Sequence, residues 1–169
     1  QADQLGSWLQ SSLDLSDTEL KKVVMRFPSL LAYSDEDNLA PKLEWLQSRL
    51  DLDVGQLKKI VLTLPSLLGC SVEENMAPKF DWLQTRLDLD ESGLRKVVLV
   101  KPQLLSYSVE DNLAPKLDWL QTRLDLDDAG LRKMVLQIPA VLACNIEDNL
   151  APTLEWLQAR LGLDDVQLK

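Results

Sequence analysis

Residues 110–128 read EDNLAPKLDWLQTRLDLDD, and nearly the same phrase stands at residues 36–54, 73–91 and 147–165. Each copy begins 37 residues after the one before it, and no insertion disturbs the register. Two sets of prolines keep the same period. The first set is Pro28, Pro65, Pro102 and Pro139, and the second set is Pro41, Pro78, Pro115 and Pro152. Self-similarity at a fixed period of this length is the sequence signature of a repeat array.

The period divides the chain into one partial and four full repeats, which we expect to form a single repeat domain over residues 1–169. The partial repeat is 1–19, and the full repeats are 20–56, 57–93, 94–130 and 131–167. Terminal repeats usually carry a polar outer face, and neither end of this sequence shows one. We therefore expect an open C-terminal end, as in a fragment of a longer array.

The first element of a repeat is typified by SDTELKKVVMRF, residues 16–27. Ser16 followed by Glu19 is a capping box, which is a usual opening of a helix. Pro28 cannot continue that helix, because its ring removes a hydrogen bond and moves the preceding residue out of the helical region. The residues PSLLAY (28–33) are too few for a second full helix. The pattern therefore predicts a single turn, for which a 3₁₀ turn is the candidate.

A second helix follows, and the capping pattern SDED at residues 34–37 opens it. Its apolar stripe consists of Leu39, Leu43, Leu46 and Leu50. This spacing is that of one helical face. Pro41 falls in about the second turn, where it should delete one backbone hydrogen bond and bend the axis. The predicted fold is all-α, an α-solenoid superhelix in which each repeat has two α-helices and a short 3₁₀ turn.

One tryptophan stands at the same helical position of every repeat, as Trp8, Trp45, Trp82, Trp119 and Trp156. On a helical wheel Trp45 lies on one flank of the second helix and the small Ala40 on the other. We expect such a tryptophan to meet an alanine of the neighbouring repeat. Arg49, four residues after Trp45, can cover the ring or form a cation–π contact. We interpret the tryptophans as packing surface, and base stacking on them is the alternative.

A pair of basic residues opens the first helix of every full repeat. The pairs are Lys21 and Lys22, Lys58 and Lys59, Arg95 and Lys96, and Arg132 and Lys133. The polar face of this helix is narrow, and the second member of each pair should be its most exposed residue. Stacked repeats would align these lysines at intervals of about 10 Å, as a basic stripe that can follow a phosphate backbone. A solvated face that pairs with acidic neighbours is the alternative interpretation.

The copies differ most around the proline that ends the first helix. The candidate partner-binding residues of this variable edge are Arg26, Tyr33, Lys101 and Tyr107. Variation of this kind is typical of a modular binding edge and equally of a tolerant loop.

Composition excludes several classes of function. The 169 residues include no histidine and only two cysteines, so the commonest general base and the commonest transition-metal ligand are absent. Any Ser–His or Cys–His nucleophile is excluded on the same ground. We predict no enzyme, no catalytic residue, no cofactor, no metal site and no small-molecule substrate. No apolar run approaches the ~20 residues of a membrane span, and we expect no membrane insertion.

The repeat itself resembles that of the mitochondrial transcription termination factor (mTERF) family. The matching features are the L-[KR]-K start, the Pro-x-[LV]-L turn, the second helix N-[LM]-x-P-x-[LF]-x-[WF]-L and the closing Leu-x-Leu, in four copies over essentially the whole chain. The resemblance implies a superhelical array, residence in a mitochondrion or chloroplast, and binding of organellar DNA or RNA along a basic surface without a catalytic centre. It also implies a part in transcription termination or initiation, RNA maturation or ribosome assembly. The residues that match the family's basic positions are the Lys/Arg pairs.

The charge of the chain departs from that of basic family members. The net charge is −9, and the four full repeats carry −1, −2, −1 and −2, which argues against a generic nucleic-acid binder. Two hypotheses follow. One is a nucleic-acid-binding array that uses the basic pairs, and the other is an acidic protein-interaction scaffold that docks on an organellar protein complex.

Overall fold

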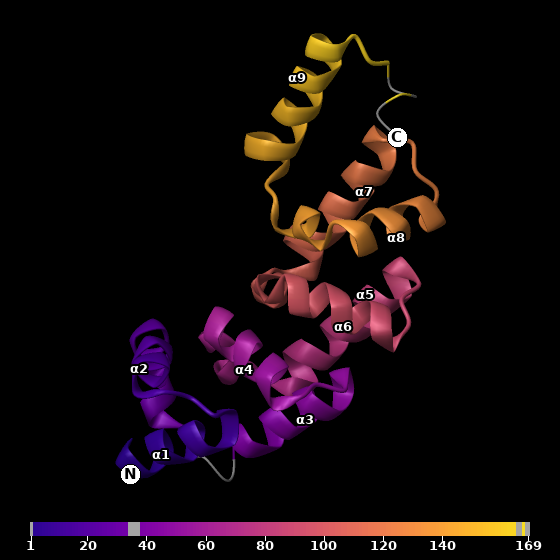
Figure 1. The fold of residues 1–169 in the computed structure, drawn as a ribbon. Coiled ribbons are helices and arrows are strands. Elements are labelled where there is room, and N and C mark those ends of the chain that lie inside the picture. The colour runs from indigo at the N-terminus through magenta and orange to yellow at the C-terminus, as the bar shows by residue number, and fades with distance from the viewer. Residues whose placement is uncertain (1, 34–37, 165–166, 168–169) are drawn as a thin grey trace. The chain divides into compact units, whose positions relative to one another are not determined.

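The computed structural model describes residues 2–33, 38–164 and 167, and these residues fold into helices connected by turns, without a strand among them (Figure 1). The α-helices are α1 (Ala2–Leu13), α2 (Asp17–Arg26), α3 (Ala40–Leu50), α4 (Val54–Thr63), α5 (Ala77–Leu87), α6 (Glu91–Val100), α7 (Ala114–Arg123), α8 (Asp128–Gln137) and α9 (Ala151–Leu161). The all-α, helical-repeat fold class predicted from the period is confirmed. No helix in this described part of the chain is long and apolar enough to cross a membrane.

A 3₁₀ turn follows each first helix, as the sequence predicted. The four turns are η1 (Pro28–Ala32), η3 (Pro65–Gly69), η5 (Pro102–Ser106) and η7 (Pro139–Ala143). Proline begins each of them, because it fixes its own backbone and cannot donate to the preceding helix. The residue before it leaves the helical region, as Phe27 does with φ −138° and ψ 72°, for the steric reason that applies before any proline.

The second helix differs from the continuous α-helix that we expected. It opens with a π-helical turn, which is η4 (Val72–Met76), η6 (Val109–Leu113) or η8 (Ile146–Leu150) in the last three repeats. The predicted cap is confirmed there, since the side chain of Ser71 accepts from the backbone N–H of Glu74. The corresponding cap of the first full repeat, residues 34–37, lies outside the described residues.

The π turn explains how the helix holds a proline so near its start. The Met76 N–H donates to the carbonyl of Ser71, and the Ala77 N–H donates to that of Val72, each five residues back. Pro78 is then the second residue of α5. A proline ring inside an α-helix clashes with the carbonyl four residues earlier, and the wider π turn moves that carbonyl away. A π turn therefore precedes the proline, and the bend of the axis that the sequence suggested stays a prediction.

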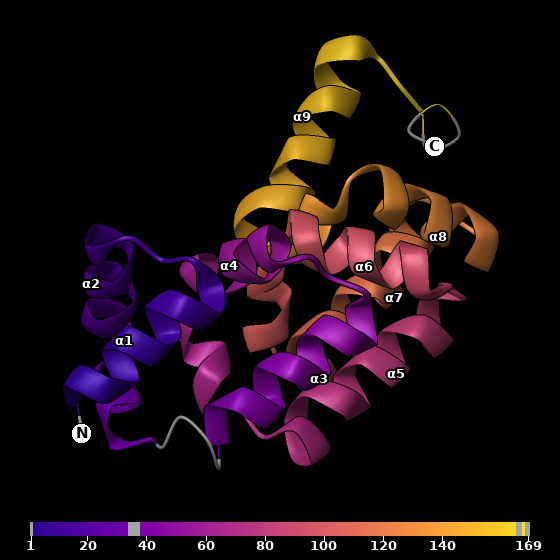
Figure 2. The same ribbon diagram turned by 60° about the horizontal axis from the view of Figure 1, so that its bottom comes forward.

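The described contacts group into two compact units, Gln1–Trp82 and Leu83–Lys169. In the first unit α1 packs against α2 and α4, and α3 packs against α4 (Figures 1 and 2). In the second unit α8 packs against both α6 and α7. The expectation of one repeat domain over residues 1–169 stays a prediction.

The core of each unit is built from the leucine stripe of the second helices. Leu39, Leu43, Leu46 and Leu50 are at most 5% exposed, which confirms the predicted stripe. Each second helix then ends on a residue with positive φ, and these residues are Asp14, Asp51, Asp88, Asp125 and Gly162. Aspartate tolerates this left-handed conformation better than most residues, and glycine does so without strain.

Candidate nucleic-acid interface and the contacts between repeats

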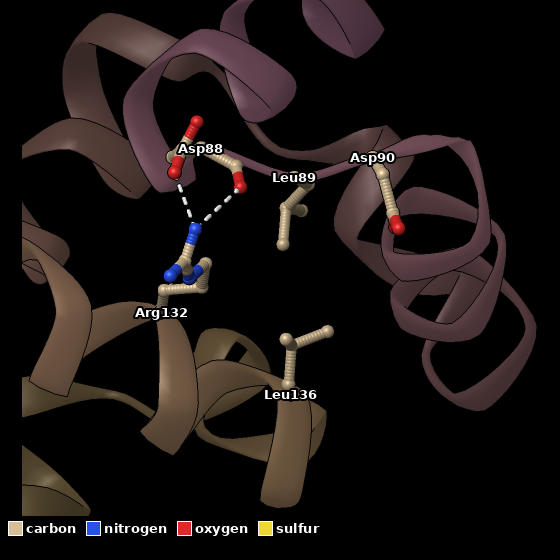
Figure 3. A pocket seen from close by; sticks show the side chains of 5 residues that line it. All are labelled: Asp88, Leu89, Asp90, Arg132 and Leu136. Atoms are coloured by element: carbon tan, nitrogen blue, oxygen red, sulfur yellow. Dashed lines mark hydrogen bonds and ion pairs between the residues drawn. The ribbon is translucent and has the colours of Figure 1, made fainter.

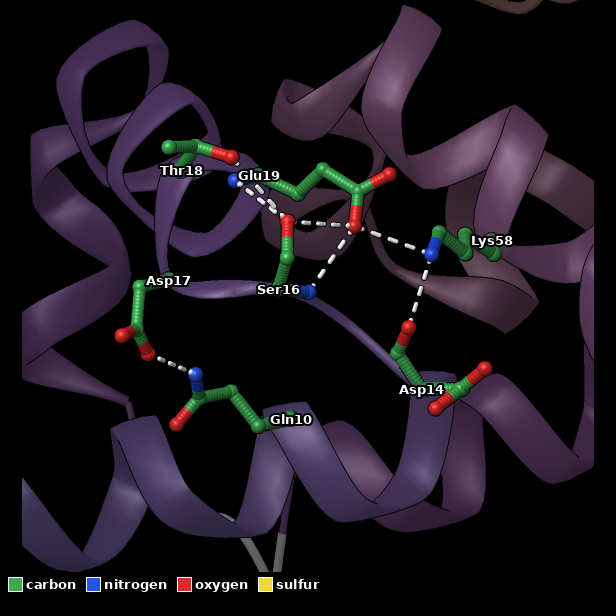
Figure 4. A network of polar contacts seen from close by, with 7 residues as sticks. All are labelled: Gln10, Asp14, Ser16, Asp17, Thr18, Glu19 and Lys58. Carbon is green, nitrogen blue, oxygen red and sulfur yellow. Dashed lines mark hydrogen bonds and ion pairs between the residues drawn. The ribbon is translucent and has the colours of Figure 1, made fainter.

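In two basic pairs the first member contacts the repeat that lies two places before its own. Lys58 Nζ donates to the carbonyl of Asp14 at 2.7 Å and forms an ion pair with Glu19 at 2.9 Å (Figure 4). Arg132 makes the same contact one unit later, where its guanidinium binds both the carbonyl and the carboxylate of Asp88 (Figure 3). In both cases a cation meets the C-terminal end of a helix, which the helix dipole favours. These two predicted binding residues therefore have a structural role.

The second member of each pair lies on the surface. Lys22, Lys59, Lys96 and Lys133 are all exposed. Of the remaining first members, Lys21 is exposed and Arg95 is half-buried. In the second and fourth full repeats the pair is thus divided into an inner cation that contacts an earlier repeat and an outer lysine that faces solvent.

A hollow of about 430 Å³ lies beside the Arg132 contact and is lined by Asp88, Leu89, Asp90, Arg132 and Leu136 (Figure 3). Its two carboxylates outnumber its one guanidinium, which Asp88 already binds. The hollow therefore offers little attraction to a phosphate.

Three buried lysines were not singled out from the sequence. Lys42, Lys79 and Lys116 follow the proline of the second helix and are 7%, 7% and 4% exposed. Lys116 Nζ donates to the carbonyl of Leu142 at 2.7 Å and to Asn112 Oδ1 at 3.0 Å. The ammonium also lies over the ring of Tyr107, 5.3 Å from its centroid.

Lys42 repeats this arrangement in the first unit. Its Nζ donates to the carbonyl of Leu68 and to Asn38 Oδ1, and it lies 5.6 Å from the ring centroid of Tyr33. Burial lowers the pKa of Lys42, and the pKa of Lys116 is lowered for the same reason. Each lysine thus binds a carbonyl of the 3₁₀ turn in the next repeat. The signal in the sequence was the dipeptide Pro-Lys, which three repeats share and which is Pro-Thr in the fourth.

The residues of the variable edge have contacts within the fold. Tyr33 and Tyr107 provide the rings beneath the buried ammonium groups. Arg26 donates to the carbonyl of Leu62 at 3.2 Å, and Lys101 is half-buried. Their role in binding a partner stays a prediction.

We interpreted the tryptophans as packing surface, and the structure describes the packing of one of them, Trp45. Its ring stacks on Phe80 of the next repeat, with 5.4 Å between centroids and 22° between planes. Arg49 forms an ion pair with Asp81 at 3.5 Å, and in the second unit Arg86 does so with Asp118 at 2.9 Å. At Trp45 and Arg49 an aromatic ring and a carboxylate of the next second helix therefore meet this flank. The expected contact between a tryptophan and an alanine stays a prediction.

Glu19 joins the capping box to the contact between repeats (Figure 4). Its carboxylate accepts from the backbone N–H of Ser16 at 2.8 Å, from Lys58 and from the Ser16 hydroxyl. These bonds, the Ser16 backbone bond first, lower the pKa of Glu19 from 4.5 to about 2. A lowered folded-state pKa contributes stability that is present above the unfolded value and is lost as the pH falls through the folded value.

We expect Glu19→Gln to reduce the loss of stability that the chain suffers at acid pH. In the parent chain the urea midpoint should fall between pH 4.5 and about 2, and in the variant it should fall less, because glutamine caps the helix without titrating. Urea unfolding at several pH values measures this effect. Glu155→Gln, which removes one charge from α9, is the control. The prediction would be contradicted if the urea midpoint fell equally with pH in the parent and in Glu19→Gln.

A model of a known protein family matches the chain twice. The family model mTERF matches residues 8–127 and again residues 48–168. None of the curated proteins compared with the chain matches it. The two matches overlap by several repeats, as expected when one model fits a periodic array in more than one register. Together they cover nearly the whole sequence, and the chain therefore belongs to the mTERF family.

Proposed function

We propose that this chain binds organellar nucleic acid through the exposed lysines Lys22, Lys59, Lys96 and Lys133 and so regulates organellar gene expression. Members of the family are generally non-enzymatic helical-repeat proteins that bind nucleic acid, and they are generally organellar. Transcription termination, RNA maturation and ribosome assembly are the processes in which such binding would act. A mitochondrion or a chloroplast is the proposed location.

The observation that carries the proposal is that, in two of the basic pairs, one cation contacts the fold and the other is exposed. Lys58 and Arg132 are used by the fold, whereas the lysine beside each of them is exposed. A solvated lysine in every full repeat supplies phosphate contacts at regular intervals, and such contacts position a protein without reading sequence. The background charge of −9 makes these four lysines the decisive cations, because the rest of the chain repels an anion.

We expect the quadruple variant Lys22→Gln, Lys59→Gln, Lys96→Gln and Lys133→Gln to lose binding to single-stranded RNA and to duplex DNA at low salt. Each phosphate contact contributes about −0.7 to −0.9 to the slope of log affinity against log salt. The parent should therefore show a slope of roughly −3 to −4, and the variant a slope near zero. Fluorescence anisotropy over a salt series measures both.

A control variant with the same change in net charge separates local contacts from the overall field. The exposed residues Ser48, Thr85, Thr122 and Ala159 lie on the second helices. Replacing all four with glutamate also lowers the net charge by four, and it should weaken binding far less than the lysine variant does. Equal losses in the two variants, or no binding by the parent at ~50 mM salt, would contradict the proposal.

The acidic scaffold is the second candidate function, and the negative charge of every full repeat favours it. Such a surface suits a basic protein partner, because complementary potentials speed association and exclude wrong partners. A parent chain that binds no nucleic acid at ~50 mM salt would favour this second function.

A further inference from the structure

The third full repeat departs from the other three around its 3₁₀ turn. Residue 100 is valine, where the equivalent residues of the other repeats are arginine, threonine and glutamine. Residue 101 is lysine, where the others are phenylalanine, leucine and isoleucine. Residue 103 is glutamine, where the others are serine, serine and alanine. We name Val100, Lys101 and Gln103 the third-repeat cluster.

The packing of the fold does not explain these three residues. Val100 ends α6 and is 49% exposed although it is apolar. Lys101 is half-buried at a position whose equivalent, Phe27, packs closely over Gly69 of the next 3₁₀ turn. The Oε1 atom of Gln103 is buried and has no hydrogen-bond partner in the described part of the chain. A buried acceptor without a donor costs stability, and residues that break the rules of a fold in this way are expected at functional sites.

The surroundings of the cluster in the sequence are basic. The exposed Lys96 lies four residues before Val100 on α6, and residues at this spacing are neighbours on one helix face. The stretch 94–107, which runs from α6 through the 3₁₀ turn, contains Arg95, Lys96 and Lys101 and no aspartate or glutamate. A nucleic-acid strand that contacts Lys96 can therefore reach the third-repeat cluster without meeting an acidic residue of this stretch.

The three side chains match the parts of one unpaired nucleotide. An exposed valine offers an apolar contact to the face of a base, and a lysine with a half-buried stem can hold its ammonium in solvent, where it binds a phosphate. The amide of a glutamine can accept from and donate to the edge of a base, which is how glutamine recognises adenine. The amide of Gln103 is available for this, because its oxygen has no bond that a turn of the side chain would break. Stacking in a duplex hides the face of a base, so the cluster suits a single strand.

We propose that the third-repeat cluster recognises one unpaired adenine of a single-stranded nucleic acid. Val100 contacts the face of the base, Gln103 pairs with its edge, and Lys101 binds a neighbouring phosphate. This inference rests on the proposed binding of nucleic acid by the exposed lysines. It adds a sequence preference to that binding, because phosphate contacts alone carry none.

The test measures the affinity of the parent chain for labelled RNA strands by fluorescence anisotropy. One strand is a short oligouridylate, and the others carry a single adenosine, cytidine or guanosine at its centre. We expect the adenosine strand to bind about tenfold more tightly than the others, which is the discrimination typical of one bidentate contact to a base. Annealing that strand to its complement should remove the preference. The same series in DNA separates a preference for the base, which both kinds of strand share, from one for the ribose.

The second repeat suggests variants that the fold tolerates. Gln103→Ser alone, and the triple variant Val100→Thr, Lys101→Leu and Gln103→Ser, give the third repeat the residues of the second. Both should lose the preference for adenosine. Gln103→Ser should leave the urea midpoint and the salt dependence of binding unchanged, because it removes no cation and no hydrogen bond at Oε1. Gln137→Ser, which changes an exposed glutamine of the fourth repeat, is the control and should keep the preference.

The outcomes separate this inference from the proposed function. Equal affinity for the four RNA strands, or a preference for another base, would overturn the inference and leave the proposed function intact. A preference for adenosine that persists in Gln103→Ser would overturn it as well. The absence of binding to any strand at ~50 mM salt would overturn both.

Discussion

Replacing Phe80 with alanine is expected to lower the free energy of unfolding by about 3–5 kcal/mol, the loss typical of a large aromatic side chain removed from a core. Phe80 is completely buried and stacks on Trp45 of the preceding repeat. The substitution therefore removes packing inside its own repeat and across the junction with the one before. In a repeat array stability is the sum of these two contributions, so one residue of this kind affects both.

Urea unfolding followed by circular dichroism measures the loss. Trp156→Ala is the matched control, since it removes an aromatic side chain that is 61% exposed. A substitution at such a surface site usually changes stability by no more than about 0.5 kcal/mol. Comparable losses for the two variants would show that burial at the junction is not the source of the stability.

Lys116→Met is expected to lower the free energy of unfolding by about 2–3 kcal/mol. Methionine keeps the apolar stem but leaves the carbonyl of Leu142 and the amide oxygen of Asn112 without the ammonium that binds both. A buried acceptor that loses its donor is costly, because no water replaces the bond. The loss should fall on the junction between the third and fourth repeats.

Thr153→Met is the matched control in the fourth repeat. Thr153 occupies the position equivalent to Lys116 and is exposed, so its replacement should leave the urea midpoint nearly unchanged. A neutral or stabilising Lys116→Met would contradict the prediction. It would mean that the cost of burying the ammonium, which lowers the pKa of Lys116, equals or exceeds what its bonds contribute.

Much of the fold could be predicted because its signals are local. The capping box of Ser16 and Glu19 fixes a helix start within four residues, and Pro28 fixes the helix end by its own covalent structure. The leucine stripe of the second helix follows from helical periodicity alone. The π turn before Pro78 could not be predicted from these rules. It depends on how the backbone avoids the proline ring, and the residue pattern is compatible with either kind of turn.

The candidate site was less predictable, because lysines of similar sequence context have different surroundings. Lys58 and Lys59 are neighbours, yet only Lys58 reaches the carbonyl of Asp14 and the carboxylate of Glu19. Lys42 resembles an ordinary surface lysine in the sequence, but it is 7% exposed. Its partner carbonyl at Leu68 is 26 residues away, beyond the range of any local pattern.

The sequence by itself determined the period of 37 residues, the helices, the 3₁₀ turns and the family, because each depends on covalent geometry or on spacing within one repeat. Only the tertiary structure decided which cations hold the stack and which remain at the surface. Whether a lysine binds a carbonyl or faces water is settled by what other repeats place beside it. For that reason Lys42 and Lys116 became part of the core, while Lys22 and Lys59 stayed in solvent.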